Sequence, residues 1–254
     1  MSAFPTPTGN PSDPSLTSHG VTQSLELAAH LSSPDFHPKP FRIYSSPFYR
    51  CLQTIQPSVE RLKAGAKSGE ISVEEGVDLD VRVEDGIGEW FGPTSYFTHP
   101  SPSPPSELAS HFPTLFHPST PEAEYTPHVL PSRQGESIAE LHDRVATAVA
   151  GIIADVDAEI TQVESSQRPE DRTSKAILLV SHAAPLIAIG RALTGNMPED
   201  SGEEDFNVFT AGLSKFVRRA RGSGNGVGDG GKGEERLAPG TKILRRGTAV
   251  PDWQ

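Results

Sequence analysis

The sequence has a single cysteine, Cys51, and no uninterrupted apolar stretch long enough to cross a membrane. One cysteine cannot form a disulfide within the chain, which is typical of proteins from reducing compartments. A membrane helix needs about 18 or more consecutive apolar residues, and the Pro-rich N-terminus lacks the basic and apolar regions of a signal peptide. We therefore expect a soluble cytoplasmic or nuclear protein with no membrane partner.

Positive charge is scarce outside the C-terminus. The net charge is -11 over 254 residues, with 22 Lys and Arg against 33 Asp and Glu. Nine of these basic residues, but only four acidic ones, lie in the last 45 residues, from Thr210 onward. An acidic body disfavours direct nucleic-acid binding, so we expect such contact only through the basic tail.

The length fits one domain with flexible ends. We interpret residues 1–16 as an extended, Pro-rich N-terminal segment and 17–220 as the domain, with a Pro-rich insertion at 93–131. Seven of the twelve residues at 222–233 are glycine, which is typical of a flexible linker. Residues 221–254 are therefore expected to be a Gly-rich linker and a basic tail.

Three short runs of apolar, β-prone residues predict strands, at 41–46, 79–83 and 176–181. The third run, AILLVS, is fully apolar up to its last residue, which is typical of a strand buried on both faces. Helical patterns separate the runs, and this alternation predicts an α/β fold with a largely parallel sheet. The insertion at 93–131 shows little periodicity, and we interpret it as a lid over a functional cleft.

Helical periodicity and end signals predict the helices. Thr17 or Ser18 can cap the first helix, and Ser137 with Glu140 forms a capping-box pattern before a long one. Pro57 predicts a kink or restart in the second helix. The residues expected to face inward are Val21, Leu25, Ala28 and Leu31 in the first helix; Cys51, Leu52, Ile55, Val59 and Leu62 in the second; and Ile138, Leu141, Val145, Ala148, Ile152, Val156 and Ile160 in the long one.

Three polar side chains follow the predicted strands. Arg50 lies in the first turns of the second helix, where its guanidinium can bind a phosphoryl group through two hydrogen bonds. His182 directly follows the apolar strand, and its imidazole can donate to a phosphoryl oxygen. Glu89 lies beside Trp90 and Phe91, an apolar setting that suits a general acid. Because the carboxyl ends of parallel strands meet at one edge of the sheet, the three predict an anion site.

Each of these residues also has an ordinary interpretation. Arg50 can be a helix-surface charge, His182 a strand-end histidine with a structural hydrogen bond, and Glu89 a solvated loop acid. Their occurrence at successive strand ends favours the site. Glycines at 226, 228 and 231 match GxGxxG but follow no strand pattern, and the insertion's histidines (His99, His111, His117 and His128) lack metal-ligand spacing. We therefore expect no cofactor and no metal ion.

Four segments together resemble the histidine phosphatase, or phosphoglycerate mutase-like, superfamily. They are LTSHGVTQ (16–23), SSPFYRCLQT (45–54), GES (135–137) and VSHAAP (180–185), and they occur in the family's order. Fungal members related to the 55 kDa tau subunit of the RNA polymerase III transcription factor are especially similar. The resemblance implies a three-layer sandwich with a largely parallel sheet, and phosphatase chemistry.

In this family a histidine of an Arg-His-Gly motif attacks phosphorus, and water then cleaves the phosphohistidine. The resemblance assigns Arg50 as the second arginine, His182 as the second histidine and Glu89 as the proton donor, with Glu84 as the alternative acid. It also implies a phosphorylated small molecule or phosphoprotein as substrate, and protein partners in the transcription machinery.

The Arg-His-Gly motif does not occur in these 254 residues. In the family it ends a first strand upstream of the segment matching LTSHG, so His19, inside that segment, does not replace it. We expect the sheet to lack this strand, leaving its neighbours with an unpaired edge, and we interpret this as an incomplete chain rather than an evolved loss. Two functions follow: a phosphomonoester-binding or hydrolysing domain that is inactive as this chain stands, or a non-catalytic docking subunit of a transcription-related assembly.

Overall fold

Three parallel strands form the central sheet. The computed structural model describes residues 6–116, 125–200, 202–203, 205–218 and 241–243. In it, β1 (Pro40–Ser45) lies between β2 (Val81–Val83) and β3 (Ala176–Val180). Both pairings are parallel, and Ile43 of β1 is opposite Val81 on one side and Leu178 on the other. The predicted α/β fold with a parallel sheet is confirmed.

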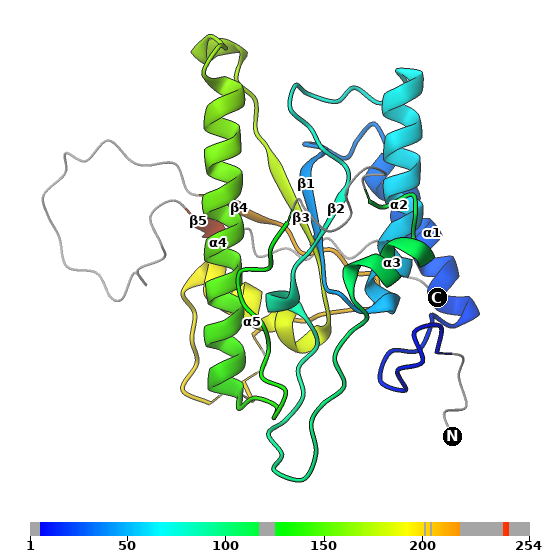
Figure 1. Ribbon diagram of the computed structural model, residues 1–254. Helices are drawn as coiled ribbons and strands as arrows, with labels where there is room; N and C mark the ends of the chain where they lie inside the picture. Colours follow the sequence, from blue (N-terminus) through cyan, green and yellow to red (C-terminus); the bar gives the residue numbers. More distant parts are fainter. Residues whose placement is uncertain (1–5, 117–124, 201, 204, 219–240, 244–254) are drawn as a thin grey trace, which may run out of the picture.

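Helices cover both faces of this sheet, which makes three layers (Figure 1). On one face lie α1 (Ser18–Ser32), α2 (Tyr49–Ser68) and the short α3 (Pro105–His111); on the other lie α4 (Ile138–Glu164) and α5 (Ala183–Thr194). Two short 3-10 helices, η1 (Asp85–Ile87) and η2 (Pro169–Asp171), lie in loops, and β4 (Phe216–Arg218) pairs antiparallel with β5 (Thr241–Ile243). None of the helices in the described residues is long and apolar enough to span a membrane.

Each face of the sheet has its own apolar core. The core under α1 to α3 is formed by Leu31, Ile43, Leu52, Ile55, Val59, Leu62, Leu79, Val81, Leu108, Phe112 and Leu115. The core under α4 and α5 is formed by Phe41, Tyr44, Ile87, Leu141, Val145, Ala148, Val149, Ile152, Val156, Ala188 and Ile189. From β1, Ile43 lies in the first core and Phe41 and Tyr44 lie in the second, so this strand is buried on both faces.

The helix starts follow the predicted signals. Thr17 caps α1, and its Oγ1 accepts a hydrogen bond of 3.1 Å from the backbone N–H of Gly20. Ser137 and Glu140 form both hydrogen bonds of a capping box at the start of α4. The second helix does not restart at Pro57, because α2 runs as one helix from Tyr49 to Ser68 with Pro57 inside it, and a kink there stays a prediction.

The inward face of α1 was predicted partly wrongly. Ala28 and Leu31 are fully buried, but Val21 is 38 % exposed and Leu25 is 46 % exposed. The third buried position of the helix is Ser24, which lies one turn before Ala28 on the same face. The hydroxyl of Ser24 donates to the carbonyl of Val21 at 2.7 Å, so this polar side chain is buried with its hydrogen bond satisfied inside α1.

The predicted burial of the apolar strand was also wrong. All five residues of β3 are half-buried, whereas all six of β1 are buried. Within the described part of the chain β3 is an edge strand, paired only with β1. An unpaired edge is what we expected for a sheet without an Arg-His-Gly strand, and it leaves apolar side chains uncovered.

The Pro-rich insertion contributes to the core as well as to the surface. It contains α3, and its Leu108, Phe112 and Leu115 are at most 1 % exposed. The segment before α3 reaches beyond the carboxyl ends of the strands (Figure 1). A lid function for that segment stays a prediction. The predicted Gly-rich linker at 222–233 and most of the basic tail lie outside the described residues, as does His117.

Candidate anion-binding site

The carboxyl ends of the three parallel strands carry the candidate site. Ser46 directly follows β1, and Arg50 lies in the first turn of α2. Glu89 lies in the loop after β2 and η1, and His182 is the N-cap residue of α5, two residues after β3. The parallel strands therefore bring the three predicted residues Arg50, Glu89 and His182 to one edge of the sheet.

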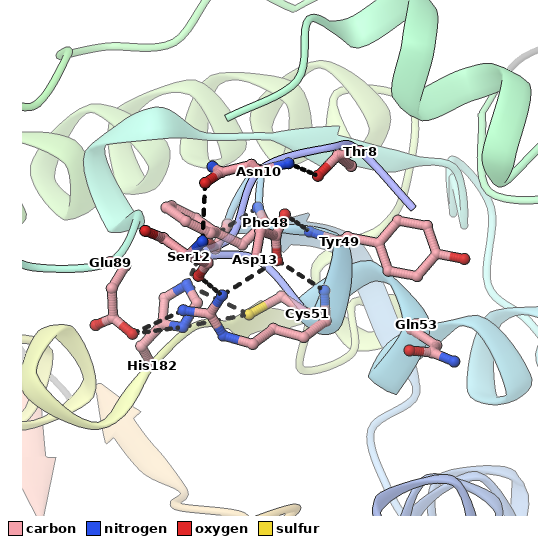
Figure 2. A network of polar contacts seen from close by, with 12 residues as sticks. Thr8, Asn10, Ser12, Asp13, Phe48, Tyr49, Cys51, Gln53, Glu89 and His182 are labelled. Carbon is pink, nitrogen blue, oxygen red and sulfur yellow. Dashed lines mark hydrogen bonds and ion pairs between the residues drawn. The ribbon is translucent and has the colours of Figure 1, made fainter. Parts of the chain in front are cut away.

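These three side chains meet at one oxygen atom. Oε2 of Glu89 lies 2.8 Å from Nη2 of Arg50 and 3.3 Å from Nδ1 of His182 (Figure 2). Glu89 and Arg50 have side chains that are 26 % and 22 % exposed, whereas the side chain of His182 is 5 % exposed. The site thus opens to solvent on the side of Arg50 and Glu89 and is closed beneath His182.

A buried aspartate fixes the guanidinium of Arg50. The side chain of Asp13 is fully buried, and its Oδ1 lies 3.1 Å from Nη1 of Arg50. Its Oδ2 accepts a hydrogen bond of 2.6 Å from the backbone N–H of Tyr49, the first residue of α2. A carboxylate at this position also interacts favourably with the positive end of the helix dipole. Asp13 therefore both caps α2 and orients Arg50.

The N-terminal segment that delivers Asp13 follows a tight path over α2. The backbone N–H of Ser12 donates to Oδ1 of Asn10 at 2.9 Å (Figure 2). The backbone N–H of Leu16 donates to Oε1 of Gln53 at 2.7 Å. The carbonyl of Ser12 accepts a second hydrogen bond from Nη1 of Arg50, at 3.0 Å. The segment is thus part of the site, which its proline content alone did not predict.

His182 is held as a neutral imidazole. Burial, followed by the charges of Arg50 and Arg144, lowers its pKa to about 3, although the nearby carboxylate of Glu89 acts in the opposite direction. Oγ of Ser46 lies 2.7 Å from Nε2, and the Phe48 ring packs nearly perpendicular to the imidazole. With Ser46 donating to Nε2, the proton of the neutral ring is on Nδ1, which faces Glu89.

Two potential nucleophiles lie next to His182, but neither suits covalent chemistry. Ser46, His182 and Glu89 are connected in the order of a Ser-His-acid triad, yet Ser46 is fully buried and beyond the reach of a substrate. Sγ of Cys51 lies 3.5 Å from Nε2 of His182. Burial raises the pKa of this thiol to about 12, so it stays protonated and is a poor nucleophile.

Two other candidates from the sequence lie outside the site. Glu84 is fully buried; it accepts a hydrogen bond from the hydroxyl of Tyr125 and further ones from the backbone N–H groups of Gly86 and His128, at 2.8 and 3.0 Å. This carboxylate joins the insertion to the loop after β2. His19 is exposed in the first turn of α1.

Sequence reasoning missed Asp13 and Ser46 as site residues. The only local signals were an aspartate between Ser12 and Pro14, and the serine that ends the strand signal within SSP. Among the described residues, no group of three or more His, Cys, Asp and Glu side chains is arranged to hold a metal ion. The groups that converge here, a guanidinium and a neutral imidazole N–H, are hydrogen-bond donors suited to an oxyanion.

Known proteins resemble the chain over most of its length. A yeast (Saccharomyces cerevisiae) protein, the transcription factor tau 55 kDa subunit, is 34% identical over 193 residues, which cover 76% of this chain and 37% of that protein. The ecdysteroid-phosphate phosphatase of Drosophila melanogaster is 24% identical over 199 residues, covering 78% of this chain and 22% of that protein. The chain therefore spans well under half the length of these curated relatives.

A solved structure shares the fold. The crystal structure of the ecdysone phosphate phosphatase from Bombix mori in complex with tungstate matches with a TM-score of 0.50 and 17% sequence identity, covering 77% of this chain and 62% of that one. The family model described as the histidine phosphatase superfamily (branch 1) matches residues 6–224. The chain belongs to branch 1 of the histidine phosphatase superfamily.

Proposed function

We propose that this chain binds phosphate monoesters at the site formed by Arg50, His182 and Glu89. The observation that carries the proposal is the convergence of Nη2 of Arg50 and Nδ1 of His182 on a single oxygen, at 2.8 and 3.3 Å. That oxygen belongs to Glu89 in this structure. A phosphoryl oxygen in the same position would accept hydrogen bonds from both donors.

A bound phosphoryl group would draw on three features of the site. Arg50 supplies charge and directional N–H groups, and Asp13 holds its guanidinium in one orientation. His182 donates from Nδ1 without adding charge, because its pKa is lowered to about 3. Glu89, once displaced from Arg50, would lie beside the ester oxygen and act as the proton donor of a hydrolysis reaction.

We further propose that these 254 residues bind the ester without turning it over. They contain no Arg-His-Gly motif, and the two nucleophilic atoms beside His182 belong to a buried hydroxyl and a buried, protonated thiol. Neither of these two atoms is exposed to a substrate. A phosphatase reaction would need a histidine supplied in an Arg-His-Gly strand.

Orthovanadate and inorganic phosphate are suitable probes. A ligand that binds only the native state raises the unfolding temperature, and at 100 times Kd it adds about 2.7 kcal/mol of stability. We expect vanadate to stabilise the wild-type chain, and Arg50→Lys or His182→Ala to remove most of this effect. Arg61→Lys is the matched control for Arg50, because Arg61 is an exposed arginine on the same helix.

The same samples test turnover with p-nitrophenyl phosphate. We expect no release of nitrophenol above that of the His182→Ala variant. Release that His19→Ala abolishes would show that the exposed histidine acts as nucleophile and would overturn the second proposal. Equal vanadate stabilisation of the wild type and of both site variants would overturn the first.

A second candidate function is docking within a transcription factor assembly. It is favoured by the 34% identity, over 193 residues, to the transcription factor tau 55 kDa subunit of yeast. A nuclear location belongs to the same proposal. Under this function the phosphatase fold would serve as a protein-binding module, and the basic tail would be an additional contact.

Affinity purification of the tagged chain from its own cells tests this function. We expect transcription factor subunits to copurify with the wild type and with His182→Ala alike, since docking does not need the anion site. Removal of residues 222–254 should reduce this set of partners. If no transcription factor subunit copurifies, docking is contradicted. If the same partners copurify after removal of the tail, the role of the tail is contradicted.

A further inference from the structure

A buried arginine on α4 holds the loop that carries Glu89. The side chain of Arg144 is 3 % exposed, and its Nε donates to both carboxylate oxygens of Glu136, at 2.8 and 3.0 Å. Its Nη1 donates to the backbone carbonyls of Gly86 and Gly88, at 3.0 and 3.1 Å. One guanidinium thus joins the start of α4 to the backbone just before Glu89.

Glu136 contacts the same loop through its backbone. Its N–H donates to the carbonyl of Phe91 at 2.9 Å, and its own carbonyl accepts a hydrogen bond of 2.8 Å from Nε1 of Trp90. Ser181, which precedes His182, donates from its hydroxyl to the carbonyl of Ile87 at 2.6 Å. The loop from residue 86 to 91 is therefore fixed on both sides of Glu89.

Stability alone does not account for this arrangement. Nη2 of Arg144 is buried and has no hydrogen-bond partner among the described residues. A buried cationic N–H without an acceptor lowers stability, and a buried ion pair is weak evidence of a stabilising role. The guanidinium is also close enough to His182 to contribute, after burial and Arg50, to the lowered pKa of the imidazole.

We infer that Arg144 and Glu136 are positioning residues of the anion site: together they fix the loop that carries Glu89 relative to Arg50 and His182, although neither contacts the bound anion. This inference rests on the proposed phosphate-binding function. It assigns a role to Glu136 of the GES segment, which precedes α4, and to Arg144, which lies within α4 eight residues later.

The test uses Arg144→Lys, which keeps the charge but cannot reach Glu136 and two carbonyls at once. Glu136→Gln is the second variant, in case the first does not fold. Arg191→Lys is the matched control. Arg191 lies on α5 and forms an equally buried ion pair with Asp205, with side chains 3 % and 7 % exposed. All variants are compared with the wild-type chain of 254 residues.

Two readouts separate positioning from stability. The indole N–H of Trp90 gives an NMR signal that reports its hydrogen bond to Glu136, and Trp253→Phe assigns it, because the chain has two tryptophans. Vanadate affinity reports the site. We expect Arg144→Lys and Glu136→Gln to shift the Trp90 signal and to weaken vanadate binding by about 10-fold or more. Arg191→Lys should lower the unfolding temperature and change neither readout.

An unchanged Trp90 signal in both Arg144→Lys and Glu136→Gln would overturn the inference. So would a loss of vanadate affinity in Arg191→Lys equal to theirs, because that would trace the loss to stability. If the wild type binds no vanadate, the proposed function fails, and the Trp90 signal, with hydrogen exchange of the amides at 86–91, still decides whether Arg144 fixes the loop.

Discussion

Arg50 and His182 are joined through a single carboxylate oxygen, Oε2 of Glu89, at 2.8 and 3.3 Å. The two residues are 132 positions apart in the sequence, and each approaches that oxygen with an N–H group. An anionic ligand must therefore compete with a carboxylate of the chain itself. Under the proposed function, the affinity for an anion therefore includes the cost of displacing Glu89 from Arg50.

Glu89→Gln should increase the affinity for vanadate by about 10-fold, which corresponds to about 1.4 kcal/mol. The amide removes a negative charge from the position that the ligand must take, and it binds Arg50 more weakly than a carboxylate does. Isothermal titration of the two proteins measures the difference. Weaker binding by Glu89→Gln would mean that Glu89 contributes a hydrogen bond to the anion rather than competing with it.

Glu84→Gln is the control for this prediction. Both residues follow β2, and both substitutions remove one negative charge. Glu84, however, accepts hydrogen bonds from Tyr125 and His128 and does not contact Arg50 through any described hydrogen bond. We expect it to lower the free energy of unfolding by about 1–3 kcal/mol, because it weakens buried hydrogen bonds, and to leave vanadate affinity unchanged.

The predicted part of the site depended on local signals. Arg50, Glu89 and His182 each follow a strand, and strand direction is enough to bring strand ends together. The capping residues Thr17 and Ser137 were likewise visible, since a cap involves only the next three residues. These features could be predicted because their partners are close in sequence or fixed by topology.

The missed part depended on distant partners. Asp13 contacts residues 36 and 37 positions further along the chain, and nothing near it in the sequence indicates the start of α2 as its partner. The burial of β3 was predicted from apolar composition, but burial also needs a neighbour on each side, and in the described sheet β3 has one. An apolar composition shows that a strand can be buried, but the neighbouring elements decide how much of it is buried.

Asp13→Ala should lower the free energy of unfolding by about 2–3 kcal/mol. The substitution removes the cap of α2 and leaves the half-buried N–H of Tyr49 without its acceptor. Urea unfolding measures the loss. Asp171→Ala is the control, because Asp171 pairs with Arg168 in a solvent-exposed ion pair and its loss should cost at most about 1 kcal/mol. Equal losses would show that Asp13 is not a structural cap.

Asp85 should make stability depend on pH near neutrality. Burial, and then the charge of Glu84, raises the pKa of this carboxyl to about 6. A pKa raised on folding means that the native state holds the proton more tightly, so the stabilisation is complete below about pH 4 and is lost as the pH rises through 6. We expect up to about 3 kcal/mol of such loss between pH 4 and 7.

Asp85→Asn should remove this part of the pH dependence. Urea unfolding at pH 4, 5, 6 and 7 compares it with the wild type and with Asp35→Asn, which makes the same charge change at an exposed position. The expected result is a flatter pH profile for Asp85→Asn only. A profile parallel to that of the wild type would mean that Asp85 titrates normally in the native state.

Gly135→Ala should be far more damaging than Gly69→Ala, although both glycines have nearly the same left-handed φ, +80° and +79°. A Cβ on Gly135 would lie 2.1 Å from the carbonyl oxygen of Gly92, whereas nothing lies within 4 Å of one on Gly69. The backbone strain common to both costs about 1 kcal/mol. At Gly135 the clash must also push the 91–92 backbone away from Glu136, which would move the loop that carries Glu89.

We expect urea unfolding of Gly135→Ala to show a loss of about 3 kcal/mol or more, and titration to show weaker vanadate binding for Gly135→Ala alone. Equal losses of stability in the two variants would mean that the approach of Gly135 to Gly92 is not needed to hold this loop.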